Sequence, residues 1–206
     1  MTARREEFWT VTEEDRLRAD LYDLMAALLV RPPSSDLIAR VRALSGGDTP
    51  LGRAISALAS GAAQATGRSV EREFNRLFIG LGRGELLPFG SVYLTGFLNE
   101  RPLAQLRRDM ASLGIERAPD VCEPEDNIAS LCEMMAGLIL GRFGSPAPLA
   151  VQRDFFDRHL APWAGHFFAD LAGAKGAAFY APVGAVGQAF MEIEVQAFRM
   201  AGEVPA

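Results

Sequence analysis

The sequence is poor in cysteine, histidine and lysine, and these shortages already exclude some classes of protein. Its 206 residues contain two cysteines, Cys122 and Cys132, and two histidines, His159 and His166. Two cysteines in a chain of this length exclude a disulfide-stapled scaffold and indicate thiols held in a reducing compartment. Lys175 is the single lysine, so arginine carries nearly all of the positive charge.

An excess of positive charge and long apolar runs are also missing. The formal net charge of -5 argues against a general nucleic-acid binder, because neutralising phosphates requires a basic face. The longest apolar runs, residues 24–30 and 134–140, are far shorter than the ~20 residues that a membrane span needs. The pair Arg4-Arg5 is not followed by the apolar segment of a secretory leader. We therefore expect a cytoplasmic protein without stable membrane insertion.

Apolar residues make up 49% of the chain, which excludes disorder over its whole length, and they recur with helical spacing. Positions 17, 21, 24, 25 and 28 are leucine or methionine, the pattern of one helix face. A segment over 178–200 carries the same period at Val183, Val186, Phe190, Ile193, Ala197 and Met200. Helices are also expected over 92–98 and 102–113.

We predict an all-α fold, a single globular domain of about eight to ten helices over residues 1–206. A segment over 115–123 reads as a linker between an N-terminal half, 1–114, and a C-terminal half, 124–206. Pro32-Pro33 is expected to end the first helix, and Gly114 suits the position after a helix end.

Segment 80–91 breaks the helical pattern with four glycines and a proline, yet it also carries three leucines and Phe89. Loops normally run over the surface, so this one either folds back on the core or offers an apolar binding surface. Gly80, Gly82 and Gly84 are spaced as in a phosphate cradle. No predicted strand precedes them and no Gly-Lys-Ser/Thr follows, so the Walker interpretation fails. Anion binding by this loop with Arg83 remains open.

Candidate catalytic and metal-binding residues do not form a convincing set. The histidines are seven residues apart and the cysteines ten apart, which does not match known metal-ligand spacings. Glu192 and Glu194 diverge on a helix and do not form a carboxylate pair for acid–base chemistry. The chain has no Gly-x-Ser-x-Gly motif. We predict neither an enzyme nor a bound metal or cofactor.

Segment 123–127, Glu-Pro-Glu-Asp-Asn, is the sharpest local cluster of acidic residues. It is typical of a helix start, with Pro124 at the first helical position and Glu125 and Asp126 in the first turn, where they favour the positive end of the helix dipole.

Four segments in order resemble one family. They are Glu73-Phe-Asn-Arg-Leu-Phe-Ile-Gly80, Leu87-Pro-Phe-Gly-Ser-Val-Tyr93, Glu123-Pro-Glu-Asp-Asn127 and His159-Leu-Ala-Pro-Trp163. Together they resemble the TorD/DmsD/NarJ family of molybdoenzyme maturation chaperones, over nearly the whole chain. This resemblance implies an all-helical, cytoplasmic, non-catalytic protein. Such a protein binds the twin-arginine leader, or the N-terminal region, of an immature molybdenum enzyme subunit until its cofactor is inserted.

The resemblance also implies a leader-binding surface. Its residues would be Phe74, Leu77, Phe78, Pro88, Phe89, Tyr93, Glu123, Asp126 and Asn127. An apolar groove could hold the apolar part of a leader as a helix, and the acidic residues could pair with its arginines. The chain departs from the family twice, with Asn127 where histidine is usual and Phe89 where tryptophan is common.

The implied partner is the precursor of a molybdopterin oxidoreductase subunit, and segment 74–98 is most similar to members associated with formate dehydrogenase. The chain would act as a monomer or homodimer. Two alternatives stay open. One is a nucleotide-binding hydrolase that uses the loop from Gly80 to Gly84 and Asp126. The other is an assembly adaptor that remains in the mature complex.

Overall fold

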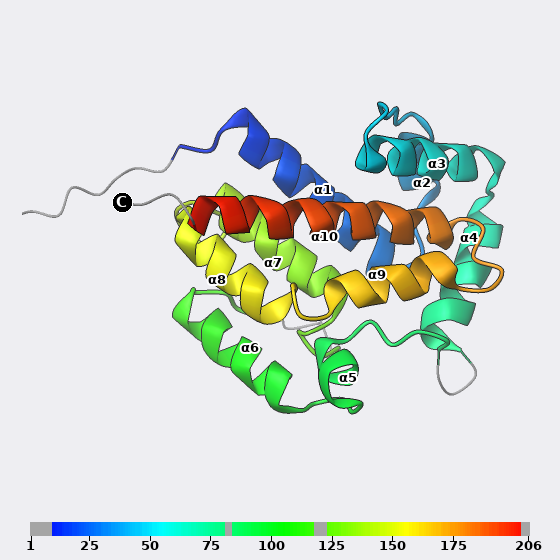
Figure 1. Cartoon of the computed structure of the whole chain (residues 1–206). Helices are drawn as coiled ribbons and strands as arrows, with labels where there is room; N and C mark the ends of the chain where they lie inside the picture. Colours follow the sequence, from blue (N-terminus) through cyan, green and yellow to red (C-terminus); the bar gives the residue numbers. More distant parts are fainter. Residues whose placement is uncertain (1–9, 81–83, 118–122, 203–206) are drawn as a thin grey trace, which may run out of the picture.

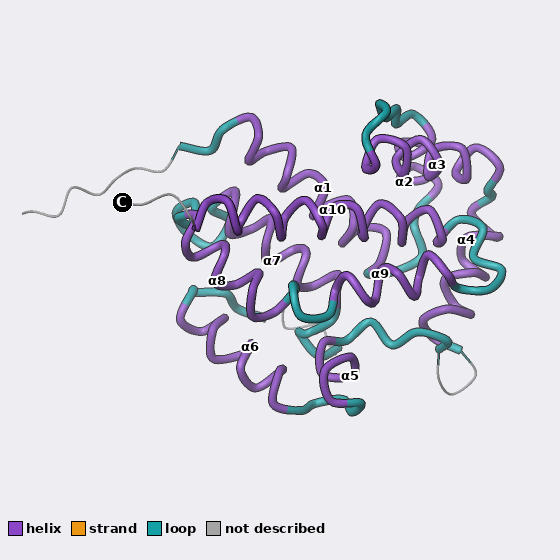
Figure 2. The backbone as a smooth tube through the Cα atoms, in the orientation of Figure 1, coloured by secondary structure: helices purple, strands orange, loops and turns teal. Residues whose placement is uncertain are grey.

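The computed structural model describes residues 10–80, 84–117 and 123–202, and the secondary structure of these ranges is helical without a β-strand (Figure 2). This confirms the predicted all-α class. The elements are α1 (Glu13–Leu29), α2 (Ser35–Arg42), α3 (Pro50–Gln64), α4 (Gly67–Phe74), the π-helix η1 (Asn75–Ile79), α5 (Gly90–Thr95), α6 (Arg101–Ser112), α7 (Ile128–Leu140), α8 (Leu149–His159), α9 (Ala164–Gly173) and α10 (Tyr180–Gly202).

Helix α10 lies at the centre of the helix packing (Figure 1). It lies against α9, α3 and α1, while α1 also packs along α7. Helices α2 and α3 lie together at one corner of the molecule, and α5 and α6 lie at the opposite edge. One cluster of buried side chains includes residues from both sides of segment 115–123, among them Tyr22, Leu106, Phe156 and Phe190. The division of the chain into two halves stays a prediction.

Local signals in the sequence set several helix ends correctly. At the start of α1, Thr12 Oγ1 accepts from the N–H of Asp15 at 3.1 Å, and the Asp15 carboxylate accepts from the N–H of Thr12 at 3.1 Å. This reciprocal capping box satisfies two amide donors that the helix itself cannot pair. Helix α1 ends at Leu29, ahead of the proline pair. Gly114 follows α6 with a positive φ of 68°, as a glycine after a helix end does.

The prediction of which residues of the first and last helices face the core is wrong in part. Leu17 is 61% exposed, and Ile193 and Met200 are 45% and 65% exposed. The buried positions instead include Tyr22 and Glu194, which are polar. The Tyr22 hydroxyl donates a hydrogen bond to Glu194, so each polar group has a partner inside the core, which apolar periodicity alone does not predict.

Two helix boundaries also differ from expectation. Helix α7 begins at Ile128, so Pro124 is not its first residue, and the acidic side chains of segment 123–127 precede the helix. Helix α5 runs from Gly90 to Thr95 and ends at Gly96, whose φ of 85° is left-handed. The expected helix over 92–98 therefore stops early. None of the described helices is both long enough and apolar enough to cross a membrane.

Candidate functional site

Backbone hydrogen bonds join the segment before α5 to the segment before α7. The N–H of Gly90 donates to the carbonyl oxygen of Asp126 at 2.9 Å. Next to this bond, Phe89 and Asn127 form an isolated antiparallel β-bridge. Phe89 is half-buried and Asn127 is buried. The structure thus brings together two of the four segments that carry the family resemblance, although the sequence alone leaves them unconnected. We call this meeting point the junction.

The Asp126 carboxylate is buried at the junction, with 3% of the residue exposed. One oxygen, Oδ2, accepts from the N–H of Ser91 at 2.7 Å, in the first turn of α5. The other oxygen, Oδ1, and the Ser91 hydroxyl have no hydrogen-bond partner among the described residues. A buried polar atom without a partner costs free energy, so native proteins keep few of them. The described residues therefore satisfy only half of the Asp126 carboxylate.

Asn127 is the N-cap of α7. Its Oδ1 accepts from the N–H of Ala129 at 2.9 Å, and its Nδ2 donates to the exposed Glu123 carboxylate at 3.2 Å. The first N–H of the helix, at Ile128, donates to the carbonyl oxygen of the buried Pro88 at 2.9 Å. Asparagine is a preferred N-cap residue, so its side chain has a clear structural role at this position.

Glu125 differs from its neighbour because its charge is already paired. Its Oε2 accepts from Arg107 Nη2 at 2.8 Å and from Nε at 3.0 Å, and its Oε1 lies 3.6 Å from Arg117 Nη1. Burial alone would raise the pKa of Glu125, but its hydrogen bonds and the charges of Arg107 and Arg117 together outweigh burial and hold that pKa below its ordinary value. Two arginines of this chain therefore occupy the carboxylate that a leader arginine would need.

A third segment of the resemblance packs on the junction through its tryptophan. The Trp163 ring lies 5.3 Å from the Tyr93 ring, and a Cβ added to Gly90 would lie 3.1 Å from Trp163 Nε1. The Tyr93 hydroxyl donates to Asp170 at 2.9 Å. Burial and this hydrogen bond raise the pKa of Tyr93. Glycine at position 90 is thus what lets the indole approach the backbone closely.

His159 begins the same segment and lies beside the junction. Its Nε2 is 2.9 Å from Asp109 Oδ2, and its ring lies 4.9 Å from the Phe155 ring. Burial lowers the pKa of His159, although the hydrogen bond to Asp109 opposes that effect. A cavity of about 10 Å³, lined by His159, Asp126 and Trp163 among others, lies between them. That volume holds about one water molecule.

The first segment of the resemblance lies elsewhere. Leu77 and Phe74 are core residues, and the half-buried Phe78 packs on Phe74 with ring centres 4.9 Å apart. Phe78 also lies 5.4 Å from Tyr180 at the start of α10. Figure 1 shows α4 and α5 in different parts of the molecule. Phe74 and Leu77 are thus buried in this structure, and their part in leader binding stays a prediction.

The glycine-rich loop folds back on the core in its described part. The N–H of Leu86 donates to the carbonyl oxygen of Leu77 at 2.8 Å. A Cβ on Gly84 would lie 2.5 Å from the backbone of Phe78, so this glycine permits close packing of two backbones. Residues 81–83, which include Gly82 and Arg83 of the suspected anion site, lie outside the described residues.

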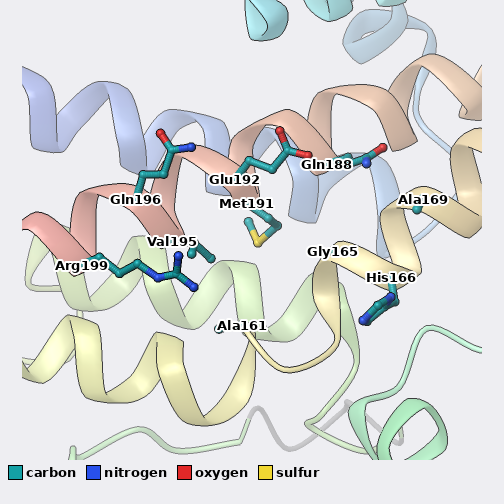
Figure 3. Close-up of a pocket in the computed structure, with 10 residues that line it drawn as sticks. All are labelled: Ala161, Gly165, His166, Ala169, Gln188, Met191, Glu192, Val195, Gln196 and Arg199. Atoms are coloured by element: carbon teal, nitrogen blue, oxygen red, sulfur yellow. The ribbon is translucent and has the colours of Figure 1, made fainter.

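A larger cleft of about 400 Å³ lies between α9 and α10. Figure 3 shows His166 on α9 and Glu192 and Arg199 on α10 at its edges, with Met191 and Val195 between. No segment of the family resemblance lines its α10 side. Within the described parts of the chain, no group of three or more His, Cys, Asp and Glu side chains could hold a metal ion. Cys132 is buried, and Cys122 lies outside the described residues.

The comparison with protein families decides the affiliation of the chain. Residues 45–169 match the model of the nitrate reductase delta subunit family. The matched region includes α3 to α8 and the whole junction. The chain belongs to this family. The expected resemblance to the TorD/NarJ chaperones is thereby confirmed.

The curated proteins that are similar to this chain share the same name. The protein called "Chaperone protein TorD" from Vibrio atlanticus is 28% identical over 139 residues, which cover 64% of this chain and 64% of that protein. The protein of the same name from Vibrio cholerae is 32% identical over 98 residues, 44% of each chain. The matches thus span less than two thirds of these relatives.

A solved structure shares the fold of this delta-subunit family member. A proposed redox enzyme maturation protein from Archaeoglobus fulgidus aligns with a TM-score of 0.54 and 18% identity, covering 92% of this chain and 99% of that one. At this identity the likeness concerns the fold alone.

Sequence reasoning missed a buried ion cluster in this family member. Arg18 Nε and Nη2 donate to Glu194 Oε1 and Oε2, each at 2.8 Å, and the Tyr22 hydroxyl donates to Glu194 Oε2 at 2.9 Å. Gln152 Oε1 accepts from Arg18 Nη1 at 3.3 Å. The cluster ties α1, α8 and α10 together. Arg18, Tyr22 and Glu194 interrupt the inward faces of α1 and α10, which could have indicated a buried polar cluster. Analysis by helical periodicity assigns such polar residues to the surface instead.

Proposed function

We propose that this member of the nitrate reductase delta subunit family is a chaperone of molybdoenzyme maturation. It would hold the precursor of a molybdopterin oxidoreductase subunit until its cofactor is inserted, before export or assembly. The curated relatives are named as TorD chaperones, which supports this proposal. The role is non-enzymatic and cytoplasmic, and it requires no cofactor of the chaperone itself.

The observation that carries the proposal is the half-satisfied carboxylate at the junction. Asp126 Oδ1 is buried without a partner among the described residues, at the point where three of the four segments that carry the resemblance meet. A guanidinium from a leader would satisfy this oxygen with a charge-assisted hydrogen bond. The adjoining cavity of about 10 Å³ is too small for an arginine side chain, so the junction must open when a leader binds.

Accessible members of the predicted set surround this carboxylate. Glu123 is exposed, while Phe89 and Tyr93 are half-buried. We assign the leader's arginine pair to Asp126 and Glu123, and its apolar helix to Phe89 and Tyr93. The remaining members of the set are Phe74, Leu77, Phe78, Pro88 and Asn127. Of these, Phe78 is half-buried and stays in the proposed surface as a separate contact. The other four are buried, and we assign them the role of holding the backbone of the surface in place.

Two other roles remain as alternatives to be tested. A nucleotide hydrolase would need the loop around Gly84, but the close packing of Gly84 on the backbone of Phe78 already accounts for that glycine. An assembly adaptor would stay bound to the mature, cofactor-loaded enzyme, whereas a chaperone would leave it. We propose formate dehydrogenase as the client and a monomer or homodimer as the active form.

Calorimetric titration of the full chain with a synthetic twin-arginine leader peptide tests the proposal. Asp126→Asn removes the charge but keeps an oxygen for the Ser91 N–H, so we expect leader affinity to fall about tenfold, or ~1.4 kcal/mol. Phe89→Ala should cost ~1–3 kcal/mol of binding, as truncation of an interface anchor does. A leader with lysines in place of its arginines should bind the parent more weakly than the original leader does. The Asp126→Asn variant should bind both leaders with equal affinity.

Asp36→Asn is the matched control, because Asp36 is exposed on α2, and Figure 1 shows α2 in a different part of the molecule from α5. It should bind like the parent. Thermal melts of each variant separate lost binding from lost folding. Parent-like melts with unchanged leader affinity in both junction variants would refute the assigned surface. An unfolded Phe89→Ala would show instead that Phe89 is a core residue.

A further inference from the structure

A second groove, of about 640 Å³, runs between the end of α5, one side of α6 and the end of α8. Three arginines line it, Arg101 and Arg108 from α6 and Arg158 from α8, together with His159. Among the described residues that line it there is no carboxylate. The chain as a whole is acidic, with a net charge of -5, so this concentration of arginine is local.

The register of α6 places its two arginines in one row. Arg101, Gln105 and Arg108 occupy positions i, i+4 and i+7, so they share one face of the helix. At a rise of 1.5 Å per residue, the backbone positions of the two arginines are about 10 Å apart. The row therefore presents two positive charges at a fixed spacing along the groove, with an amide between them.

These guanidinium groups are available to a partner. Arg101 has no hydrogen-bond or ion-pair partner in the part of the chain that the structure describes. Arg108 donates to the neutral side chain of Gln105. Arg158 is shared between Asp109 at 3.3 Å and Asp154 at 3.9 Å, and its side chain is still 54% exposed.

Exposed apolar side chains extend from the same groove. Helix α5 ends at Gly96, and the residues around this end turn outward: Leu94 is 42% exposed, Phe97 70% and Leu98 44%. Leu94 lines the groove itself. Three large apolar residues exposed within five positions form a local patch of the kind that marks interaction sites. We call these three residues the apolar rim.

We propose that the groove and its apolar rim bind an acidic amphipathic segment of a protein partner. Two carboxylates spaced by about two helical turns would pair with Arg101 and Arg108, while apolar side chains of the same segment cover Phe97. An extended polyanion such as nucleic acid, or an anionic membrane, would be repelled by the net negative charge of the rest of the chain.

This surface goes beyond the proposed function, because its charge preference is opposite to that of the junction. A leader with an arginine pair suits Asp126 and Glu123, whereas the groove rejects arginine and attracts carboxylates. The groove shares Leu94, Pro102, Arg158 and His159 with the small cavity beside Asp126. Arg101 and Arg108 line the groove alone, so substitutions at these two positions impair it without changing the lining of that cavity.

Selection from a displayed library of random 16-residue peptides on the full-length chain tests this inference. Counter-selection uses the double variant Arg101→Ala/Arg108→Ala, in which both substitutions lie on an exposed helix face and are well tolerated by a helix. Peptides retained by the parent alone should be rich in Glu or Asp together with Leu or Phe. The best of them, labelled and titrated by fluorescence anisotropy, should lose at least tenfold in affinity with the double variant.

Further variants and probes make each outcome decisive. Phe97→Ser should weaken the same peptide several-fold, Arg40→Ala on α2 should leave it unchanged, and a Glu-to-Gln version of the peptide should not bind. A twin-arginine leader should bind the double variant as it binds the parent. Failure to enrich acidic peptides, or equal binding by the double variant, overturns the inference. So does a preference for phosphatidylglycerol vesicles or inorganic phosphate over the peptide.

Discussion

Two buried carboxylates of this chain have opposite surroundings. Glu194 on α10 is fully buried, and both of its oxygens accept hydrogen bonds, from Arg18 and Tyr22. Asp126 at the junction is 3% exposed, and one of its oxygens has no partner among the described residues. The same kind of group is thus saturated in one region and half satisfied in the other.

This difference separates a structural role from a binding role. A buried ion pair with all of its hydrogen bonds made needs nothing from outside, and breaking it leaves an uncompensated charge. A half-satisfied carboxylate carries a desolvation cost that a ligand with a suitable donor can relieve. We therefore expect changes at Glu194 to act on folding and changes at Asp126 to act on binding.

The largest effect is expected from Glu194→Ala. This change leaves the Arg18 guanidinium and the Tyr22 hydroxyl without their main partner, so the free energy of unfolding should fall by ~3–5 kcal/mol. Urea denaturation followed by circular dichroism measures it. Glu192→Ala, on the exposed side of the same helix, is the control and should stay within ~0.5 kcal/mol of the parent. A loss below 1 kcal/mol at Glu194 would show that the cluster is not structural.

A matched pair of charge-neutral variants sharpens the comparison directly. Glu194→Gln replaces an acceptor with an amide group that faces the donors of Arg18 or Tyr22, so we expect a loss of ~2 kcal/mol of unfolding free energy. Asp126→Asn keeps the bond from Ser91 and places its amide at the unpaired oxygen, so its loss should be smaller. The same denaturation experiment ranks the two. Equal losses would contradict the view that both oxygens of Glu194, but only one oxygen of Asp126, have hydrogen-bond partners among the described residues.

A glycine at the junction tests how tightly that region is packed. A Cβ at Gly90 would lie 3.1 Å from Trp163 Nε1, so Gly90→Ala should cost ~1 kcal/mol or more as the indole shifts. Gly173→Ala on α9 meets nothing within 4 Å and should stabilise the helix slightly. Thermal melts of the two variants should therefore move in opposite directions. A stabilised Gly90→Ala would mean that Trp163 does not rest on this backbone.

Local features of the fold were predictable, and long-range ones were not. The helix end at Gly114 depends on neighbours in sequence, so the sequence alone sufficed to predict it, and the capping box of Thr12 is equally local. Glu194 pairs with Arg18, which lies 176 residues away, so its burial had no local signal. The junction could not be predicted for the same reason. Segment 123–127 is typical of a helix start, but Asp126 lies outside the helix and accepts a hydrogen bond from Ser91, a residue 35 positions away in the sequence.

The smallest expected effect concerns pH and compares the two histidines. Burial lowers the pKa of His159 below its ordinary value of about 6.5, against the opposing hydrogen bond to Asp109 and with the help of the charge on Arg158. The unfolded chain therefore binds a proton at higher pH than the folded chain does. Stability from this group is complete above that ordinary value and declines as the pH falls through it toward the lower folded pKa.

His159→Gln keeps a donor for Asp109 but cannot titrate, so the unfolding free energy of this variant should change less between pH 7 and pH 5 than that of the parent. His166→Gln on α9 is the matched control, because it makes the same substitution at an exposed position. Urea midpoints measured across this range decide between them. If both variants follow the parent curve, burial does not favour the neutral form of His159.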